Sequence, residues 1–428
     1  MIAAHVSLWG TRIGAVQQDG ADDIPVFNYD PDFLRSGIEL SPLEMPLSGA
    51  IYSFPALKGE SFHGLPGMLA DSLPDRFGNA LLDSYLAQTG RDFKRLCAVE
   101  RLLYTGTRGM GALEYEPSDD RFAYSGSIDI DALVSVANEV LGQREGIHET
   151  MDETGLARLA SVGTSAGGAR AKAVIAWNRE TNDVRSGQVE ADSGYEHWLI
   201  KFDDIMRNKD KGDSYDRPAY TRIEFAYYLM ALEAGIEMSE CGLLGESDRQ
   251  HFMTRRFDRT ASGGKLHMQT LGALAHFDFN HPAAQSYEQA ASVMRHLNLG
   301  QDRIEQLYLR MLFNVSARNQ DDHVKNLSFL MDRRGVWNLA PAYDVTYAND
   351  PGNKWLSRHQ MTVAGKADNI GLDDLLAAAK AMDVSRSRAL EMVEQVNEAI
   401  SAWSTFAQQA SVPERAYEEI ARNLLAVR

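Results

Sequence analysis

Two acidic residues and one amide in the second half of the chain have the types and spacing of a magnesium-dependent phosphotransfer site. Asp321 and Asn326 stand five residues apart in a polar loop, and Asp344 follows beyond an apolar hairpin. Carboxylate and amide oxygens are the hard ligands that Mg²⁺ prefers, and a carboxylate also accepts the proton of an attacking hydroxyl group. These residue types therefore suit the transfer of a phosphoryl group from Mg-ATP.

The order of these residues is that of a protein kinase active site. In kinases an Asp of the catalytic loop accepts the substrate's hydroxyl proton, an Asn five residues later holds magnesium, and an Asp beyond a short hairpin holds metal as well. Here the apolar runs 327–331 and 336–339, separated by a polar turn, predict the hairpin. The Asp-x-x-x-x-Asn spacing alone is also common in solvated loops. The complete set predicts Asp321 as the base, and Asn326 and Asp344 as metal ligands.

Length and composition are those of a folded protein with more than one domain. The chain has 428 residues, of which 44% are hydrophobic and 24% are charged, and this length exceeds a single compact core. Cys97 and Cys241 lie far apart, which gives no disulfide framework and fits a reducing cytoplasm. We find no signal peptide and no apolar run long enough for a membrane span, so we expect a cytoplasmic protein without a membrane partner. The net charge of −17 argues against a large nucleic-acid footprint.

The elements upstream of the loop follow the order of the small lobe of a kinase. Hydrophobic periodicity predicts two strands, a helix and a third strand, at residues 171–177, 197–202, 222–235 and 251–257. Lys201 lies in the second strand and is predicted to neutralise the α- and β-phosphates of ATP. The alternative is an edge-strand lysine that faces water. Glu224, in the first turn of the helix, either pairs with Lys201 or complements the helix macrodipole.

A loop of small residues precedes the first of these strands. It contains Thr164, Ser165 and the pair Gly167 and Gly168. Backbone N–H groups beside glycine bind phosphates readily because no Cβ blocks the approach. The pattern is neither G-x-G-x-x-G nor a P-loop, and without the downstream site a flexible linker is the simpler interpretation.

Several polar residues near these motifs have two interpretations each. His323 orients the loop or acts in the chemistry, and Lys325 contacts the transferring phosphate or is solvated. The run 255–259, which contains Phe257, resembles a lobe-connecting strand whose backbone reads adenine, or its charges form a solvated face. A metal-hydrolase site at Asp321, Asp322 and His323 is disfavoured, because no second His pair stands at ligand spacing.

These elements predict an α+β, bilobal protein-kinase-like fold. It has a small β-rich lobe with an N-terminal α/β subdomain and a large helical C-terminal lobe. The N-terminal part contains a predicted hairpin at 6–16 and a predicted helix at about 76–88, followed by a second helix at 129–141. Residues 304–315 and much of 371–428 also have helical patterns. We place the N-terminal subdomain at 1–120, the small lobe at 121–258 and the large lobe at 259–428.

With these residues assembled, the chain resembles the HipA family, the serine/threonine kinase toxins of bacterial toxin–antitoxin modules. The resemblance covers most of the chain. The motifs that carry it are Phe62 to Asp75, Gly168-Ala169-Arg170-Ala171-Lys172, His197 to Lys201, Arg256-Phe257-Asp258-Arg259, Asp321-Asp322-His323-Val324-Lys325-Asn326 and Ala340-Pro341-Ala342-Tyr343-Asp344.

The resemblance implies a role for each matching residue. It implies Asp321 as the catalytic base, with Asn326 and Asp344 as magnesium ligands. It implies Ser165 as an autophosphorylation site, with Thr164 as a second acceptor. It implies Lys201 on the ATP phosphates and Phe257 in the segment that reads adenine. The other residues that we predict to bind ATP are Gly167, Gly168, Lys172, His323 and Lys325.

The resemblance also implies partners. Members of the family phosphorylate protein serines, in known cases on aminoacyl-tRNA synthetases, and are held by a HipB-type antitoxin with a helix-turn-helix domain. We therefore expect ATP and Mg²⁺ as cofactors, a translation-related protein substrate, and a separate antitoxin that makes most of the DNA contact. Asp322 is a departure, because some members carry Gly there, which puts metal geometry and substrate approach in doubt.

Two classes of function remain open: an active kinase, or a nucleotide-sensing or partner-binding corepressor on a kinase scaffold. The presence of Lys201, Asp321, Asn326 and Asp344 together favours the kinase. We further predict that Ser165 is a self-inhibiting switch, because a phosphate of about −1.5 to −2 charges there would repel the phosphates of ATP. The alternative is a serine that bonds its own loop backbone.

Overall fold

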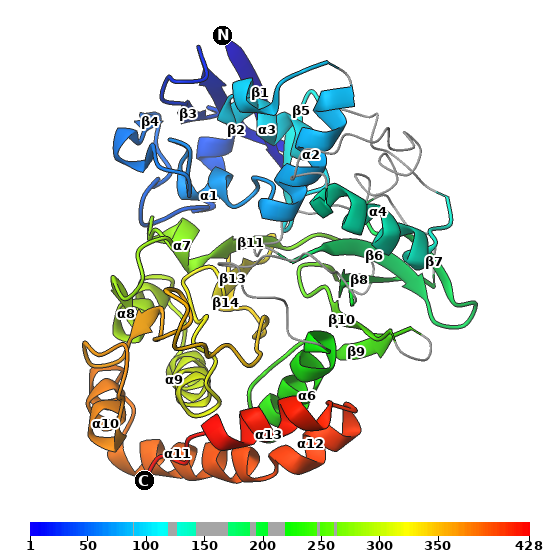
Figure 1. Cartoon of the computed structure of the whole chain (residues 1–428). Coiled ribbons are helices and arrows are strands. Elements are labelled where there is room, and N and C mark those ends of the chain that lie inside the picture. Colours follow the sequence, from blue (N-terminus) through cyan, green and yellow to red (C-terminus); the bar gives the residue numbers. More distant parts are fainter. Residues whose placement is uncertain are drawn as a thin grey trace. The chain divides into compact units, whose positions relative to one another are not determined.

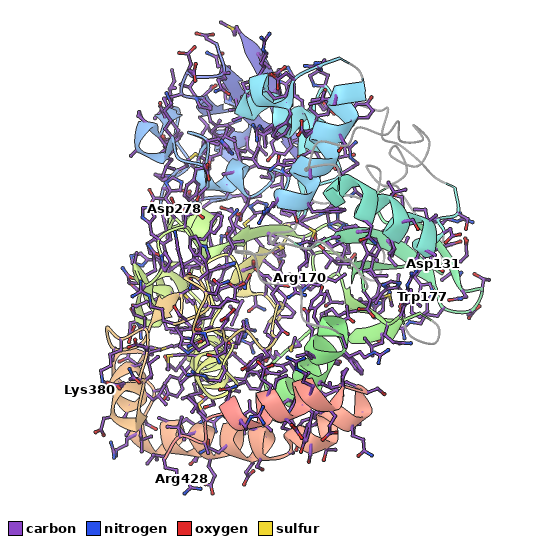
Figure 2. The ribbon with its side chains drawn as sticks, in the orientation of Figure 1. Asp131, Arg170, Trp177, Asp278, Lys380 and Arg428 are labelled. Carbon is purple, nitrogen blue, oxygen red and sulfur yellow. The ribbon has the colours of Figure 1, made fainter. Side chains whose placement is uncertain are left out.

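The computed structural model describes most of the chain, in eight stretches: residues 1–88, 90–118, 126–142, 170–188, 194–203, 219–245, 249–260 and 263–428. Thr164, Ser165, Gly167 and Gly168 lie outside the described residues, and so do the predicted phosphate loop and its switch. Description resumes at Arg170, labelled in Figure 2.

The chain forms two compact units, each built from three stretches of sequence. Unit 1 contains residues 1–216, 253–269 and 330–336. Unit 2 contains residues 217–252, 270–329 and 337–428. The predicted loop and its metal ligands all belong to unit 2, whereas Lys201 belongs to unit 1.

Unit 1 holds one five-stranded sheet, most of a second sheet, and several helices (Figure 1). Its elements are β1 (Ile2–Leu8), β2 (Thr11–Gln18), β3 (Val26–Tyr29), η1 (Phe33–Ser36), β4 (Ile51–Ser53), η2 (Pro55–Leu57), α1 (Gly67–Ala70), α2 (Arg76–Gln88), η3 (Phe93–Arg95), α3 (Ala98–Thr105), β5 (Leu113–Glu116), α4 (Ile130–Gly142), β6 (Lys172–Asn178), β7 (Asp183–Ser186), β8 (Glu196–Lys201) and most of β10 (His251–Arg255) and β11 (His267–Thr270).

The first sheet of unit 1 has the strand order β4-β3-β2-β1-β5. The predicted N-terminal hairpin is confirmed, with Val6 of β1 opposite Gly14 of β2. Alternate residues of these strands, such as Val6, Val16 and Phe27, are fully buried, as expected for a sheet with one covered face. Helix α3 packs against β1, β2 and β5 (Figure 1).

The second sheet explains the environment of Lys201. Within unit 1 its strands run in the order β7-β6-β8-β10, so β8 is an interior strand. The successive residues Trp198 to Lys201 are all buried, which means that both faces of β8 are covered. Lys201 is 7% exposed. The alternative of an edge-strand lysine facing water is therefore wrong, because the strand has neighbours on both sides.

Unit 2 is mainly helical. Its elements are α6 (Tyr220–Glu233), β9 (Cys241–Leu244), α7 (Leu271–Leu274), β12 (Gln285–Ser286), α8 (Tyr287–His296), α9 (Gln301–Ser316), the start of β13 (Ser328–Met331), β14 (Trp337–Leu339), β15 (Met361–Thr362), α10 (Leu372–Ala381), α11 (Arg386–Ser401), α12 (Trp403–Gln409) and α13 (Glu414–Asn423). The predicted hairpin before Asp344 is formed by β13 and β14.

Helix α9 is the central helix of unit 2, and most of its residues are buried. It packs against α8 and α11, while α6 packs against α11 and α12 (Figure 1). Aromatic side chains join these helices: the ring of Tyr227 lies 6.3 Å from that of Phe313 and 5.6 Å from that of Trp403. The predicted site loop, residues 321–326, begins a few residues after α9 ends at Ser316, so a well-packed helix lies next to its start. Within the described residues, no helix is long and apolar enough to cross a membrane.

Candidate functional site

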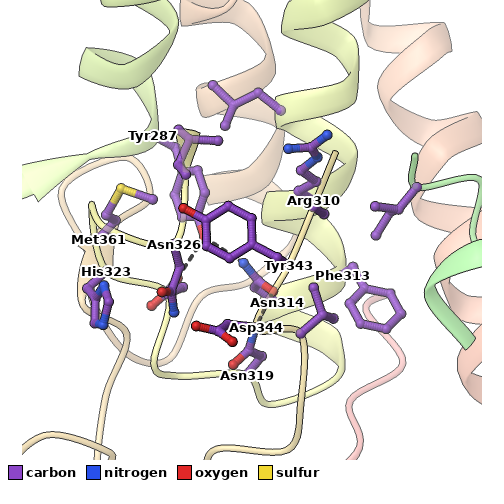
Figure 3. A pocket seen from close by; sticks show the side chains of 16 residues that line it. Tyr287, Arg310, Phe313, Asn314, Asn319, His323, Asn326, Tyr343, Asp344 and Met361 are labelled. Atoms are coloured by element: carbon purple, nitrogen blue, oxygen red, sulfur yellow. Dashed lines mark hydrogen bonds between the residues drawn. The ribbon is translucent and has the colours of Figure 1, made fainter. Parts of the chain in front are cut away.

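One pocket in unit 2 is lined by both predicted metal ligands and by other residues of the predicted site loop. It has a volume of about 470 Å³, open to solvent, and the side chains of α8, α9, the site loop and the segment after β14 line it (Figure 3). Asn326 and Asp344 are both lining residues, together with Asp322, His323 and Tyr343. Asp321 stands in the same loop, and its side chain is 25% exposed.

The site loop, residues 321–326, closes on itself through Asn326. The side-chain nitrogen of Asn326 donates to the carbonyl oxygen of Asp321 at 2.8 Å. Its backbone N–H donates to the carbonyl oxygen of His323, also at 2.8 Å. Since the amide nitrogen is engaged, the side-chain oxygen of Asn326 is the atom left to accept a cation. The five-residue spacing therefore corresponds to a tight loop in which the Asn326 side chain is bonded to the backbone of the predicted base.

The segment that carries Asp344 is fixed on both sides. Arg310 of α9 donates to the carbonyl oxygen of Ala340 at 2.9 Å. Burial lowers the pKa of Arg310 to about 10, so it stays charged at neutral pH and this hydrogen bond is charge-assisted. The hydroxyl of Tyr343 donates to the carbonyl oxygen of Lys325 at 2.6 Å, which ties this segment to the site loop.

Asp344 itself has a left-handed backbone, with φ of 53°. Among residues other than Gly, Asp and Asn adopt this conformation most readily. It turns the carboxylate of Asp344 toward the side of the pocket where Asn326 lies (Figure 3). Two predicted ligands that are 18 positions apart in the sequence thus line one pocket.

The donors fit magnesium. A carboxylate and an amide oxygen suit Mg²⁺, which usually keeps several waters and takes only one or two protein carboxylates beside substrate phosphates. Across the described residues, no group of three or more His, Cys, Asp or Glu side chains gathers as a metal site.

His323 and Lys325 have local contacts that organise the loop. Nε2 of His323 lies 3.9 Å from Oδ1 of Asp321, which is too long for a hydrogen bond. Nδ1 of His323 accepts from the backbone N–H of Lys325 at 3.3 Å. The Phe279 ring contacts both residues, with its centroid 5.8 Å from that of His323 and 4.9 Å from the ammonium of Lys325. The geometry supports loop orientation by His323, and contact of either residue with ATP stays a prediction.

The sequence alone assigned no role to Asp322. It is buried and accepts three hydrogen bonds: from the hydroxyl of Tyr287 at 2.7 Å, from Nδ1 of His359 at 2.9 Å and from the backbone N–H of Gln360 at 2.8 Å. Burial by itself raises the pKa of Asp322, but these three partners together hold it below its ordinary range. Both carboxylate oxygens are engaged by the protein, so Asp322 is not placed as a metal ligand.

The remaining described site residues belong to unit 1. Lys201 and Lys172 are paired across β8 and β6, and Phe257 lies in the turn after β10, half-buried. The ammonium of Lys172 lies 3.2 Å from a carboxylate oxygen of Asp75, and both side chains are 3% exposed. A buried carboxylate therefore already neutralises Lys172.

The charged run after β10 is not a solvated face. Arg256 and Asp258 are 4% and 0% exposed, and Nη2 of Arg256 lies 2.6 Å from Oδ2 of Asp258. Arg259 reaches the same oxygen at 2.9 Å, and the backbone N–H of Gly111 donates to it at 2.7 Å. The solvated-face alternative is wrong for these residues because their charges are compensated inside the protein.

Comparison with known proteins identifies the family. Residues 4–116 match the HipA N-terminal domain, and residues 164–403 match the HipA-like C-terminal domain. The chain belongs to the HipA family. The resemblance found in the sequence is thereby confirmed, and it extends over both domains.

A solved structure supports the fold of this HipA-family protein. Its structure is similar to that of HipA from Shewanella oneidensis MR-1, solved with HipB and its operator DNA, with a TM-score of 0.65 and 15% sequence identity over 98% of this chain and 94% of that one. A weaker similarity, with a TM-score of 0.30 and 10% identity, covers 53% of this chain and 92% of CtkA, a proinflammatory kinase of Helicobacter pylori. No curated protein has a significantly matching sequence. The similarity to HipA confirms the predicted α+β, kinase-like fold class.

Proposed function

We propose that this HipA-family protein is a Mg-ATP-dependent serine/threonine protein kinase and the toxin of a HipBA-type module. One observation supports the proposal most strongly. Asn326, bound through its amide nitrogen to the backbone of Asp321, lines the same pocket as Asp344. A protein that only binds a partner has no physical need for a carboxylate base beside two hard oxygen ligands.

Each residue has a distinct part in the proposed transfer. As the serine oxygen of the substrate bonds to the γ-phosphorus of ATP, Asp321 takes the serine proton, and the bond from that phosphorus to the bridging oxygen breaks to leave ADP. Asn326 and Asp344 would hold magnesium, which supplies charge neutralisation at the phosphates when it is bound. Lys201 would neutralise the α- and β-phosphates.

Other residues complete the proposed ATP site. Phe257 stands in the segment proposed to read adenine, and His323 and Lys325 are proposed to contact the phosphates. Gly167 and Gly168 would cover these phosphates. The buried ion pair with Asp75 argues against a direct contact between Lys172 and ATP, because the ammonium would have to give up its 3.2 Å contact with a buried carboxylate.

The partners belong to the same proposal. HipA of Shewanella oneidensis was solved with HipB and operator DNA, which supports a separate HipB-type antitoxin for this chain, with DNA contact mainly through it. We propose a translation-related protein as substrate, such as an aminoacyl-tRNA synthetase, and autophosphorylation at Ser165 or, second, at Thr164. A cytoplasmic location fits a substrate of this kind.

The proposal is tested by incubating the protein with γ-labelled ATP, Mg²⁺ and a bacterial lysate, followed by mapping of the labelled residues. We expect label on serine or threonine of at least one lysate protein, and on Ser165 or Thr164 of the chain itself. Binding of Mg-ATP without any transfer would contradict the kinase and favour the nucleotide-sensing corepressor instead.

A further inference from the structure

The carboxylate next to the proposed base is held by a buried network from three separate parts of unit 2. Asp322 is 3% exposed, whereas the adjacent Asp321 side chain is 25% exposed. The side chains of Asp321 and Asp322 therefore occupy opposite environments. Because one planar peptide unit joins the two residues, hydrogen bonds that fix Asp322 also restrict the backbone of Asp321.

The partners of Asp322 are themselves anchored. Tyr287 is the first residue of α8, and its hydroxyl also accepts from the side-chain nitrogen of Asn314 in α9 at 3.0 Å. The side-chain oxygen of Asn314 in turn accepts from Asn319 at 2.9 Å, just before the loop. The network therefore connects the loop to two well-packed helices.

The third part of the network is the segment directly before β15, which contains His359 and Gln360. The backbone N–H of His359 donates to the carbonyl oxygen of Ala367 at 2.8 Å, and the carbonyl oxygen of Gln360 accepts from the N–H of Ala283 at 2.8 Å. The next two residues form β15, which pairs in parallel with β12 directly before Tyr287. The segments that carry His359 and Tyr287 are thus joined by the pairing of β15 with β12.

We propose that Asp322 is a positioning residue for phosphotransfer, acting on Asp321 through its hydrogen bond with His359. This inference rests on the proposed kinase function and deepens it. A buried carboxylate is costly unless it is fully paired, and a loop that needed only to be folded could place an apolar side chain there. The carboxylate instead fixes both position and direction, since each of its bonds has a defined geometry.

Substitution of Asp322 should separate catalysis from ATP binding. In Asp322→Asn the amide has only one acceptor oxygen, so at least one of the three hydrogen bonds is lost. Asp321 then loses its fixed position while Asn326 and Asp344 are unchanged in identity. We expect the maximal rate of self-labelling from γ-labelled ATP to fall by ~10–100-fold, with the half-saturating ATP concentration and the calorimetric affinity for Mg-ATP changed less than about twofold.

His359 provides a conservative and a disruptive variant. In His359→Asn the amide nitrogen takes the place of Nδ1 and can still donate to Asp322, whereas His359→Leu removes the donor. We expect near-parent rates for the Asn variant and a loss like that of Asp322→Asn for the Leu variant. The double variant with Asp322→Asn and His359→Leu should lose little more than either single one, because both act through one interaction.

An exposed aspartate in the same unit serves as the matched control. Asp383 is 75% exposed and pairs with Arg295 at 2.8 Å, so Asp383→Asn removes a charge without touching the network. All rates are compared below the thermal midpoint of every variant. Unaltered maximal rates in folded Asp322→Asn and His359→Leu would overturn the positioning role while the kinase proposal stands. A parent protein that never transfers phosphate would overturn both.

Discussion

Asn326 and Asp344 show how two single residues define the site. The amide nitrogen of Asn326 is used on the carbonyl of Asp321, so its oxygen is left for a cation. The left-handed backbone of Asp344 directs its carboxylate into the same pocket. Both facts depend on residue type, since an aspartate at 326 could not donate and a bulky residue at 344 would be strained.

Replacement of Asp344 should strongly weaken metal-dependent ATP binding. In Asp344→Ala the only carboxylate proposed as a metal ligand is lost, and a bound metal supplies several kcal/mol of charge stabilisation. We expect the affinity for Mg-ATP to fall on the order of 100-fold, measured by calorimetric titration.

A matched control exists for the backbone effect of this change. Asp383 also has a left-handed backbone, with φ of 58°, but it is exposed and lies outside the pocket. Asp383→Ala should therefore leave Mg-ATP binding at the parent level. Equal affinities of Asp344→Ala and Asp383→Ala would remove Asp344 from the metal site.

At the residue scale, the sequence was informative where chemistry depends on local spacing. The order of Asp321, Asn326 and Asp344 is visible in the sequence, and the structure places the two predicted ligands on one pocket. The partner of Asp322 could not be predicted, because His359 is 37 positions away and belongs to no local pattern. Only the tertiary structure brings the two together.

At the element scale, hydrophobic periodicity predicted most strands and helices that position the site. The helix predicted at about 76–88 is α2 (Arg76–Gln88), and the helix predicted at 222–235 is α6 (Tyr220–Glu233). Periodicity could not predict which charges would be buried. Lys172 forms an ion pair with Asp75, which is 97 positions away. Asp258 forms ion pairs with Arg256 and Arg259 inside unit 1.

The buried cluster around Asp258 joins Gly111, just before β5, to the proposed adenine segment. Gly111, whose N–H donates to Asp258, has φ of +75°, and a Cβ there would lie 2.9 Å from the backbone nitrogen of Met268. Only Gly fits this close approach. Burial by itself raises the pKa of Asp258, but Arg256 and Arg259 hold it well below its ordinary range.

Replacement of Asp258 should therefore destabilise unit 1. Asp258→Asn leaves two buried guanidinium groups without a counter-charge, and breaking a buried pair of this kind costs about 3–5 kcal/mol. We expect a lower midpoint of urea unfolding at pH 7. The folded pKa of Asp258 is lowered, so its contribution is present above its unfolded pKa of about 3.9 and declines as the pH falls below that value. The difference in urea unfolding midpoint between the parent and Asp258→Asn should therefore become smaller as the pH falls below that pKa.

An exposed pair in the same unit provides the comparison. Asp32 pairs with Arg35 at 2.7 Å, with side chains that are 82% and 75% exposed, and exposed pairs contribute about 0–1 kcal/mol. Asp32→Asn should leave the unfolding midpoint nearly unchanged. A similarly small change in Asp258→Asn would mean that the buried cluster does not stabilise the unit.

At the scale of the whole molecule, the two HipA domain matches and the HipA fold agree at only 15% sequence identity with the Shewanella protein. Such divergence preserves the buried pattern of strands and helices, which many sequences can satisfy. The sequence could therefore predict the fold class from motifs and periodicity. It could not predict the substrate, because recognition of a protein partner depends on surfaces that carry no local spacing rule.

If the protein is a kinase with Asp321 as its base, loss of the Asp321 carboxylate should stop phosphate transfer without loss of ATP binding. Phosphate transfer from γ-labelled ATP is compared between the parent and Asp321→Asn, with the Mg-ATP affinity of each measured in parallel. The amide keeps the shape of the side chain but cannot take the serine proton, so transfer should fall by ~10²–10⁴-fold while Mg-ATP affinity is retained. Phosphate transfer by Asp321→Asn at the parent rate would show that Asp321 is not the base.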